Sequence, residues 1–150
     1  MSADDQTRRD ALWSLSLGYA RSVDQRETES FLALFVPDAE LSIHNPPDAD
    51  ATSVYRGHED LARIPPRMAR FRATFHLLGQ ADYHLDGEEP TGEVYCVAHH
   101  RSAGDDDPTD YVMFIRYRDR YRRHDGQWRI AERRVLVDWT ETRPVNPPGR

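Results

Sequence analysis

His76 is the first residue whose chemistry stands out, because its imidazole interrupts a run that reads as a strand entering a tight turn, "RATFHLLGQADYHLDG" (residues 72–87). No second histidine at metal-ligand spacing, serine elbow or glycine loop accompanies it. An imidazole can act as a general base near neutral pH when another group fixes its tautomer. The question is therefore which residue is the partner of His76.

Two further histidines are adjacent in "VYCVAHHR". Neighbouring side chains of a strand point to opposite faces, so both cannot bind one metal ion in regular geometry, and only one can face a pocket. If Tyr95 and Val97 face inward, His99 does too and His100 faces outward, and this is the arrangement we expect. The alternate positions are also apolar, which leaves the opposite assignment open: Val94, Cys96 and Ala98.

Other kinds of catalytic chemistry find little support in the sequence. Cys96 is the one cysteine, and a small thiol in an apolar strand usually belongs to the core. All 20 basic residues are arginine, which excludes a lysine nucleophile or Schiff base. No HExxH motif or other cluster of metal ligands occurs. We therefore expect neither a metal ion nor a cofactor.

The length of 150 residues is enough for one domain with an internal pocket. We expect a polar N-terminal segment at 1–9, the domain at 10–142 and a flexible C-terminal tail at 143–150. The polar, acidic start predicts that there is no signal peptide. Because no apolar run reaches about 18 residues, we expect a cytoplasmic protein without a membrane partner.

The formal net charge of −6 argues against a nucleic-acid partner. "RYRDRYRR" (116–123) interleaves arginine with tyrosine, as proteins that bind single-stranded nucleic acid can do. We interpret its arginines as a solvated outer face whose partners are acidic residues on neighbouring strands. The alternating pattern then predicts an inner face that carries Tyr111, Met113, Ile115 and Tyr117.

The pattern of apolar residues predicts helices first and strands afterwards. Helical spacing marks residues 8–22 and the segment "ETESFLALF", which we expect Pro37 to end. A strand at 39–44, a short strand in "SVYRG" and a proline-broken helical stretch, "HEDLARIPPRMARF", follow. Long strands are predicted at about 73–85, 91–102, 109–122 and 127–140, joined by turns that combine aspartate with glycine. This order predicts an α+β domain with helices on one face of a curved antiparallel sheet.

The ordered set of these segments resembles the SnoaL-like branch of the nuclear transport factor 2-like superfamily, whose members include scytalone dehydratase and the lindane dehydrochlorinase. The segments that carry the resemblance are "LGYARSVDQRETESFLALFVPDAEL", "YRGHEDL", "TFHLLGQADYHLDG", "GEVYCVAHHR" and "RYRDRYRRHDGQWRIAERRVLVDW". The resemblance covers about residues 10–142. It implies a cone-shaped, cystatin-like α+β barrel, in which N-terminal helices close an apolar pocket.

The resemblance also supplies a partner for His76, because both named relatives pair a histidine at this position with an aspartate at the position of Asp24. As catalytic residues, Asp24 would fix the tautomer of His76, and His76 would take a proton from the substrate. The residues expected to bind substrate are Tyr19, Tyr95, His99, Tyr117 and Arg133. Val23 stands where scytalone dehydratase has a tyrosine, so the resemblance does not imply that particular dehydration.

We therefore expect a small lyase or isomerase that abstracts a proton from an apolar, possibly cyclic substrate. One alternative is a non-catalytic protein that binds a hydrophobic small molecule in the same pocket. Another is a structural subunit resembling the β subunit of a ring-hydroxylating dioxygenase, because that subunit shares the fold. Relatives are commonly dimers or trimers, and we expect a homodimer or homotrimer.

Overall fold

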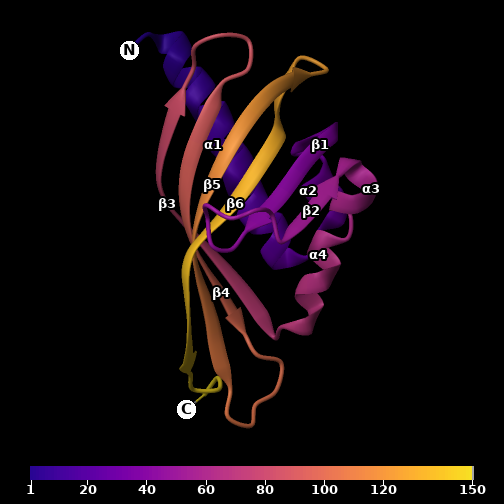
Figure 1. The fold of residues 1–150 in the computed structure, drawn as a ribbon, viewed down its shortest axis with the longest axis vertical. Helices are drawn as coiled ribbons and strands as arrows, with labels where there is room; N and C mark the ends of the chain where they lie inside the picture. The colour runs from indigo at the N-terminus through magenta and orange to yellow at the C-terminus, as the bar shows by residue number, and fades with distance from the viewer. Residues whose placement is uncertain (150) are drawn as a thin grey trace.

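One mixed sheet dominates the structure (Figure 1). The computed structural model describes residues 1–149, and within them six strands form a single sheet in the order β2-β1-β6-β5-β4-β3. The strands are β1 (Phe35–His44), β2 (Ser53–Arg56), β3 (Ala73–His84), β4 (Thr91–Arg101), β5 (Thr109–His124) and β6 (Gln127–Pro144). The helices are α1 (Ala3–Gln25), α2 (Thr28–Leu32), α3 (Gly57–Leu61) and α4 (Ile64–Arg67), and η1 is a 3₁₀ turn at Met68–Arg70. This order confirms the expected α+β class.

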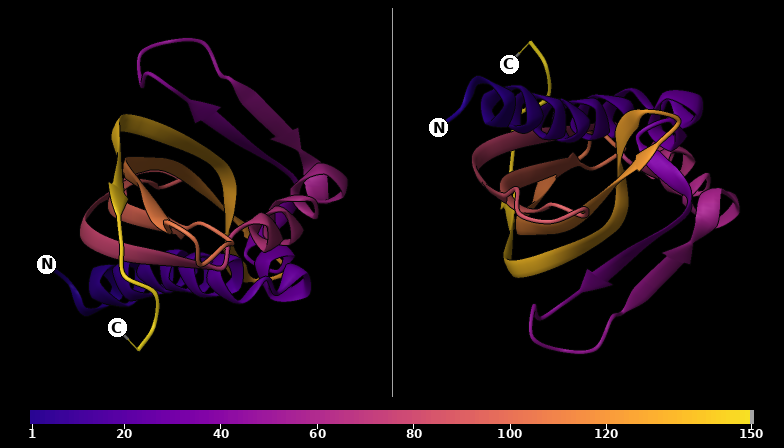
Figure 2. Two further views of the ribbon diagram at one scale, coloured as in Figure 1. Left: turned by 90° about the horizontal axis from the view of Figure 1, so that it is seen from below. Right: turned by 90° about the horizontal axis from the view of Figure 1, so that it is seen from above.

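The four long strands form the antiparallel meander that the sequence predicts. β1 extends the sheet by pairing in parallel with β6 and in antiparallel with β2. The pairing shifts between Leu78 and Ala81 in β3, and again beside Phe114 and Arg120 in β5. Such bulges increase twist and bend a sheet. The sheet curls into an unclosed cone, and α1 runs across its concave side (Figure 2).

The first helix begins earlier than expected. Ser2 caps α1, because its hydroxyl accepts a hydrogen bond from the Asp5 N–H at 3.1 Å and the Asp5 carboxylate accepts one from the Ser2 N–H at 3.4 Å. Residues 3–9 are therefore helical and continuous with the rest of α1. The apolar face of α1 is buried at the predicted spacing: Leu12, Leu15, Tyr19 and Val23.

The second helix is shorter than expected, since α2 ends at Leu32 and Phe35 already belongs to β1. Pro37 disfavours helical geometry at Val36, the residue before it, and so favours the extended backbone with which β1 begins. Pro37 lies within β1, where the register against β6 shifts between Phe35 and Glu40. A residue without a backbone N–H is tolerated at such an irregular position.

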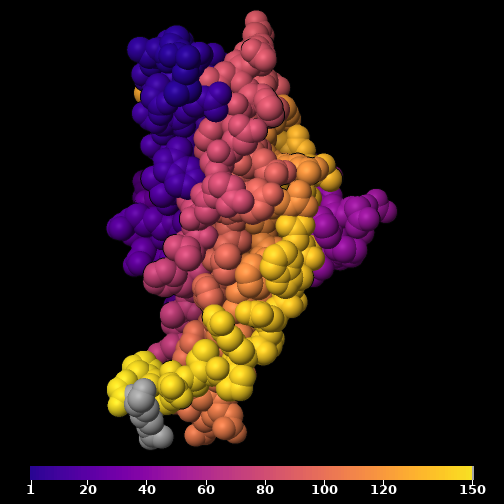
Figure 3. Space-filling view, turned by 90° about the vertical axis from the view of Figure 1, so that its left-hand side faces the viewer, coloured from indigo at the N-terminus to yellow at the C-terminus, as the bar shows by residue number. Residues whose placement is uncertain are grey.

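The arginine-rich face of β5 pairs across strands, which confirms that interpretation. The cross-strand ion pairs are Arg116–Asp138, Arg118–Glu93 and Arg120–Glu132. Figure 3 shows the strands beside α1, with the surface of β3, β4 and β6 open along the length of the molecule.

No helix within residues 1–149 has an apolar stretch long enough to cross a membrane.

Candidate active site

Asp24 and His76 meet where the end of α1 crosses β3. The Nδ1 atom of His76 lies 2.7 Å from Asp24 Oδ1, and the backbone N–H of His76 donates to Asp24 Oδ2 at 3.0 Å. Thr74, on the same face of β3, donates its hydroxyl to Asp24 Oδ1 at 2.8 Å. The two side chains that the sequence pairs are therefore in contact, and Thr74 is an additional partner that was not foreseen.

The surroundings of Asp24 keep its carboxyl ionised. Burial by itself would raise the pKa of Asp24, but the hydrogen bonds from His76 and Thr74 outweigh it and hold that pKa below its usual value. An ionised Asp24 can only accept a hydrogen bond, so the proton of the neutral His76 ring lies on Nδ1. The lone pair of the imidazole is then on Nε2.

A cavity of about 260 Å³ opens beside this pair, between the helices and the concave face of the sheet. His76 lines the cavity, and 7% of its side chain is exposed. Its Nε2 atom makes no hydrogen bond within residues 1–149, so this nitrogen is available to a ligand. Most of the wall is apolar, and its aliphatic and methionine side chains are Val23, Leu41, Ile43, Ile64, Met68, Met113, Ile115 and Val135.

The structure reverses the expected faces of β4. His76 is directly opposite Ala98, and opposed residues of an antiparallel pair share one face of the sheet. Ala98 therefore faces the interior, and His100, two residues further along β4, lines the cavity. The prediction that Tyr95 and His99 bind substrate from inside the cavity is wrong, because both lie on the outer face.

Each of these two outward residues has a role outside the cavity. His99 places its Nδ1 atom 2.6 Å from Asp110 Oδ2, in a second His–Asp contact on the outer face. Tyr95 is exposed and lines a shallow hollow with Leu77 and Trp139.

His100 is the histidine that accompanies His76 in the cavity. Their ring centroids are 5.9 Å apart at an interplanar angle of 79°. The Nδ1 atom of His100 lies 3.0 Å from the carbonyl oxygen of Tyr111, which can only accept, so Nδ1 carries the proton. Burial lowers the pKa of His100. His100 is therefore favoured as a neutral ring in the cavity.

Tyr19 and Tyr117 line the cavity, whereas Arg133 lies behind them. Arg133 is fully buried, with its guanidinium carbon 4.3 Å from the ring centre of Tyr19 and 4.2 Å from that of Tyr117. It donates to Asp119 at 2.8 and 2.7 Å and to the Ser16 hydroxyl at 2.9 Å. The prediction that Arg133 binds substrate is therefore wrong, because its ion pair with Asp119 holds it in the core, where it does not line the cavity.

The two tyrosines keep their phenolic protons in this setting. Burial raises the pKa of Tyr19 to about 12 and holds that of Tyr117 well above its usual value. Both can therefore serve as hydrogen-bond donors at neutral pH.

Sequence reasoning missed the side of the cavity that the proline-broken stretch and β2 provide. Ile64 and Arg67 come from α4, Arg70 comes from η1, and Tyr55 comes from β2. The short helices around two consecutive prolines have no clear periodicity, so the pattern alone does not show which side chains face inward. The concentration of arginines in "RIPPRMARF" was the available signal.

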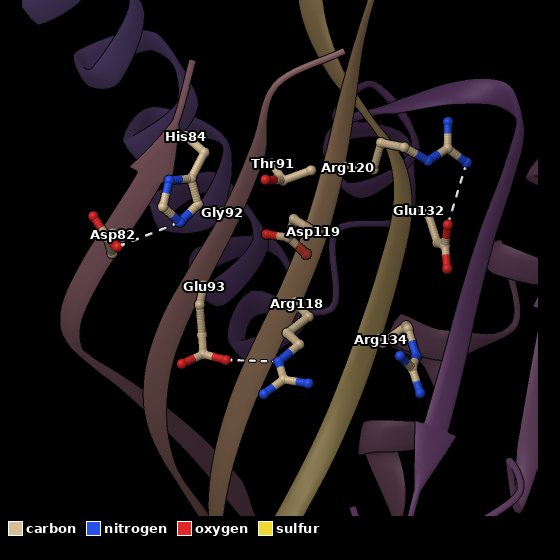
Figure 4. A pocket seen from close by; sticks show the side chains of 10 residues that line it. All are labelled: Asp82, His84, Thr91, Gly92, Glu93, Arg118, Asp119, Arg120, Glu132 and Arg134. Atoms are coloured by element: carbon tan, nitrogen blue, oxygen red, sulfur yellow. Dashed lines mark hydrogen bonds and ion pairs between the residues drawn. The ribbon is translucent and has the colours of Figure 1, made fainter. Parts of the chain in front are cut away.

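A larger hollow, of about 470 Å³, lies on the opposite face of the sheet (Figure 4). Its charged side chains are largely committed to each other, since Arg118 donates to Glu93 at 2.7 Å and Arg120 donates to Glu132 at 3.2 Å. We therefore locate the candidate site in the smaller cavity, which holds His76. Among residues 1–149, no group of three or more histidine, cysteine, aspartate or glutamate side chains could hold a metal ion.

Comparisons with known proteins agree with this fold. A provisionally assigned scytalone dehydratase from Novosphingobium aromaticivorans has a TM-score of 0.78 and 22% identity, covering 100% of this chain and 99% of that one. A hexachlorocyclohexane dehydrochlorinase, LinA Type2, has a TM-score of 0.81 and 17% identity, covering 98% of each chain. A Mycobacterium tuberculosis protein of unknown function has a TM-score of 0.74 and 25% identity, covering 92% of this chain and 77% of that one.

The sequence itself matches the family model of the SnoaL-like domain over residues 5–134. No curated relative matches it at a significant level. The family match spans most of the chain, and the TM-scores show that the similar structures share its fold. The chain therefore belongs to the SnoaL-like domain family, within the nuclear transport factor 2-like superfamily.

Proposed function

We propose that this protein is a cofactor-independent lyase or isomerase, in which His76 removes a proton from an apolar, possibly cyclic substrate. The observation that carries the proposal is the contact of His76 Nδ1 with Asp24 at 2.7 Å, at the wall of a mostly apolar cavity. Family membership supports this class of reaction, since the similar structures include proteins named as a dehydratase and a dehydrochlorinase.

The chemistry follows from the two ring nitrogens of His76. Asp24 accepts the Nδ1 proton, so Nε2 presents its lone pair to the substrate. When Nε2 takes the proton, the ring becomes positively charged and the Asp24 carboxylate stabilises it. The electron pair left on the substrate forms a double bond as a leaving group departs, or the proton returns at another carbon in an isomerisation.

Neighbouring donors would stabilise the charge that develops on the substrate. His100 is neutral with its proton on Nδ1, which faces the Tyr111 carbonyl, so its Nε2 atom can accept a hydrogen bond from the substrate but cannot donate one. Tyr117 lines the cavity and keeps its phenolic proton, so it is a donor. A neutral donor in a water-poor cavity can stabilise an oxyanion or a leaving group without attracting a counter-ion in the ground state. We assign Tyr19 a similar role.

The proposal is tested by turnover on cyclic substrates that can undergo elimination, hexachlorocyclohexane and cyclic β-hydroxy ketones among them, with products identified by mass spectrometry. Asp24→Asn should lower the rate by roughly two to four orders of magnitude, the range typical of losing a positioned acid–base partner. His76→Ala should remove turnover. His99→Ala is the matched control, because it disrupts the outer His–Asp contact, and it should keep the wild-type rate.

Non-catalytic binding of a hydrophobic small molecule is the alternative, and the apolar wall of the cavity favours it. A ligand that binds equally well to wild type and His76→Ala, with no turnover of any substrate by wild type, would support it. Stable copurification with a larger partner chain would instead favour a structural subunit.

A further inference from the structure

Arg67 and Arg70 give the mouth of the His76 cavity a positive charge. Arg67 donates an Nη1 hydrogen to the Tyr55 hydroxyl at 2.8 Å, and the guanidinium carbon of Arg70 lies 4.8 Å from the ring centre of Phe71. Within residues 1–149, neither arginine forms an ion pair. Arg63, on the same stretch, differs because it pairs with Asp60 and does not line the cavity.

Among the described residues, no acidic side chain of the cavity wall neutralises these two arginines. In the described part of the chain, no aspartate or glutamate lines the cavity. Asp24 lies behind His76, and both of its oxygens accept hydrogen bonds from Thr74 and His76. Burial lowers the pKa of His100, and the positive charge of Arg70 acts in the same direction. The fixed charge at the cavity is therefore positive.

Exposed arginines without an ionic partner are often simply hydrated, so a binding role for these two depends on where they lie. These two converge on one cavity from consecutive turns, α4 and η1, and each guanidinium is held against a neighbouring side chain. Phe71 links Arg70 to the cavity, because its ring centroid lies 4.9 Å from that of His100. Arg70 thus lies close to His100, and both arginines line the cavity that holds the two histidines.

Building on the proposed function, we infer that the substrate carries a carboxylate, which Arg67 and Arg70 bind at the mouth while the apolar body occupies the cavity and presents a C–H bond to His76 Nε2. The planar guanidinium fork matches a carboxylate well. This carboxylate is a binding group remote from the reacting carbon, and its binding orients the bond that is to be broken. The cavity of about 260 Å³ favours a compact ligand, of the size of a single substituted ring.

The test compares matched acids and amides, which differ in charge and little in shape. Binding of cyclohexanecarboxylate and benzoate is measured by calorimetry at low ionic strength, beside cyclohexanecarboxamide and benzamide. Wild type should bind the acids about tenfold more tightly than the amides, since one charge-assisted hydrogen bond accounts for a difference of that order. Added salt should reduce the preference, because the arginines are exposed.

Variants then assign the preference to these two residues. The double variant Arg67→Gln/Arg70→Gln should bind acid and amide alike, whereas Arg63→Gln should keep the preference. Circular dichroism checks that each variant is folded. Equal binding of acids and amides by wild type, no binding of either, or a preference that survives in the double variant would show that the inference is wrong.

The outcome is separable from that of the proposed function. His76→Ala should keep the preference for carboxylates and lose turnover. Turnover that survives in His76→Ala would defeat the proposed role of His76 and leave carboxylate binding standing. A missing preference, with turnover still dependent on His76, would defeat only the carboxylate.

Discussion

At the scale of single residues, Asp24 occupies a position that local stability does not favour. It lies in the last turn of α1, where the helix dipole disfavours negative charge, and no basic residue accompanies it there. Partial burial adds a desolvation cost. The hydrogen bonds from His76 and Thr74 offset both effects. A carboxylate that depends on such partners is suited to hold a histidine in one tautomer.

The same balance predicts how stability depends on pH. The folded-state pKa of Asp24 is lowered from an ordinary value of 3.8, so the unfolded chain binds this proton more readily than the folded chain does. The stabilisation is present above pH 3.8 and is lost as the pH falls through the lower, folded-state pKa. Denaturant titrations across this range should show a shallower acid loss for Asp24→Asn than for wild type.

Asp138→Asn is a useful comparison for that measurement. The hydrogen bond from Arg116 lowers the pKa of Asp138 as well. Asp138→Asn should therefore also make the loss of stability at acid pH shallower, although Asp138 lies outside the cavity. Parallel acid limbs for wild type and Asp24→Asn would contradict the assigned environment of Asp24. Both variants remove a carboxylate that stabilises the fold, but only Asp24→Asn should also lower turnover.

At the scale of elements, the sequence predicted where the strands lie better than which way their side chains point. The meander after residue 72 followed from strict alternation and from the turns. In β5 the correct face was predicted, because arginines mark its outer side. In β4 both faces are apolar, so alternation alone did not determine whether His99 or His100 faces inward. The pairing of His76 with Ala98 decides it, and register is a long-range property.

The candidate site shows the same division. The partner of His76 lies 52 residues away, and only the resemblance to a family connected the two positions. Arg133 was expected to bind substrate, whereas it lies behind the two tyrosines. Its ion pair with Asp119 joins two strands, so the sequence around Arg133 does not reveal it. The proline-broken stretch provides Arg67 and Arg70, and a segment without periodicity does not predict its inward face.

Two glycines predict opposite responses to a small substitution. A Cβ at Gly92 in β4 would lie 2.6 Å from Cδ1 of Tyr83, a ring atom in the core. A Cβ at Gly18 in α1 would lie 2.8 Å from Cδ2 of Leu34, the end of a side chain that can rotate. Gly92→Ala should lower the free energy of unfolding by about 1–3 kcal/mol. Gly18→Ala should change it little or raise it by up to about 1 kcal/mol, because alanine favours helix. Urea denaturation measures both.

At the scale of the whole molecule, the two faces of the sheet differ in what covers them. The concave face packs under α1 and encloses the cavity. The outer face carries a row that crosses four strands, in which each residue is the direct partner of the next: Leu77, Val97, Phe114 and Trp139. The rings of Phe114 and Trp139 stack at 4.3 Å, and Leu77 and Trp139 are 57% and 59% exposed.

This row predicts that the outer face binds a second copy of the chain. Large apolar side chains exposed together on one face mark an interaction surface more often than scattered ones do. Charges of both signs flank the row, with Arg116 and Arg118 beside Glu93 and Asp138. Because these charges already pair within one chain, they do not oppose the approach of an identical surface, and a twofold axis would place the row against its own copy, which favours a dimer.

Light scattering on the purified protein at micromolar concentration measures this assembly, and we expect wild type to be a dimer. Trp139→Glu places a charge within the row, beside Phe114, and should shift the protein to monomer, because a buried unpaired charge is strongly unfavourable at an interface. Leu17→Glu is the matched control, since Leu17 is an exposed leucine of α1 outside this row, and it should leave the dimer intact. A wild-type monomer, or a dimer that Trp139→Glu does not weaken, would mean that this face has no such role.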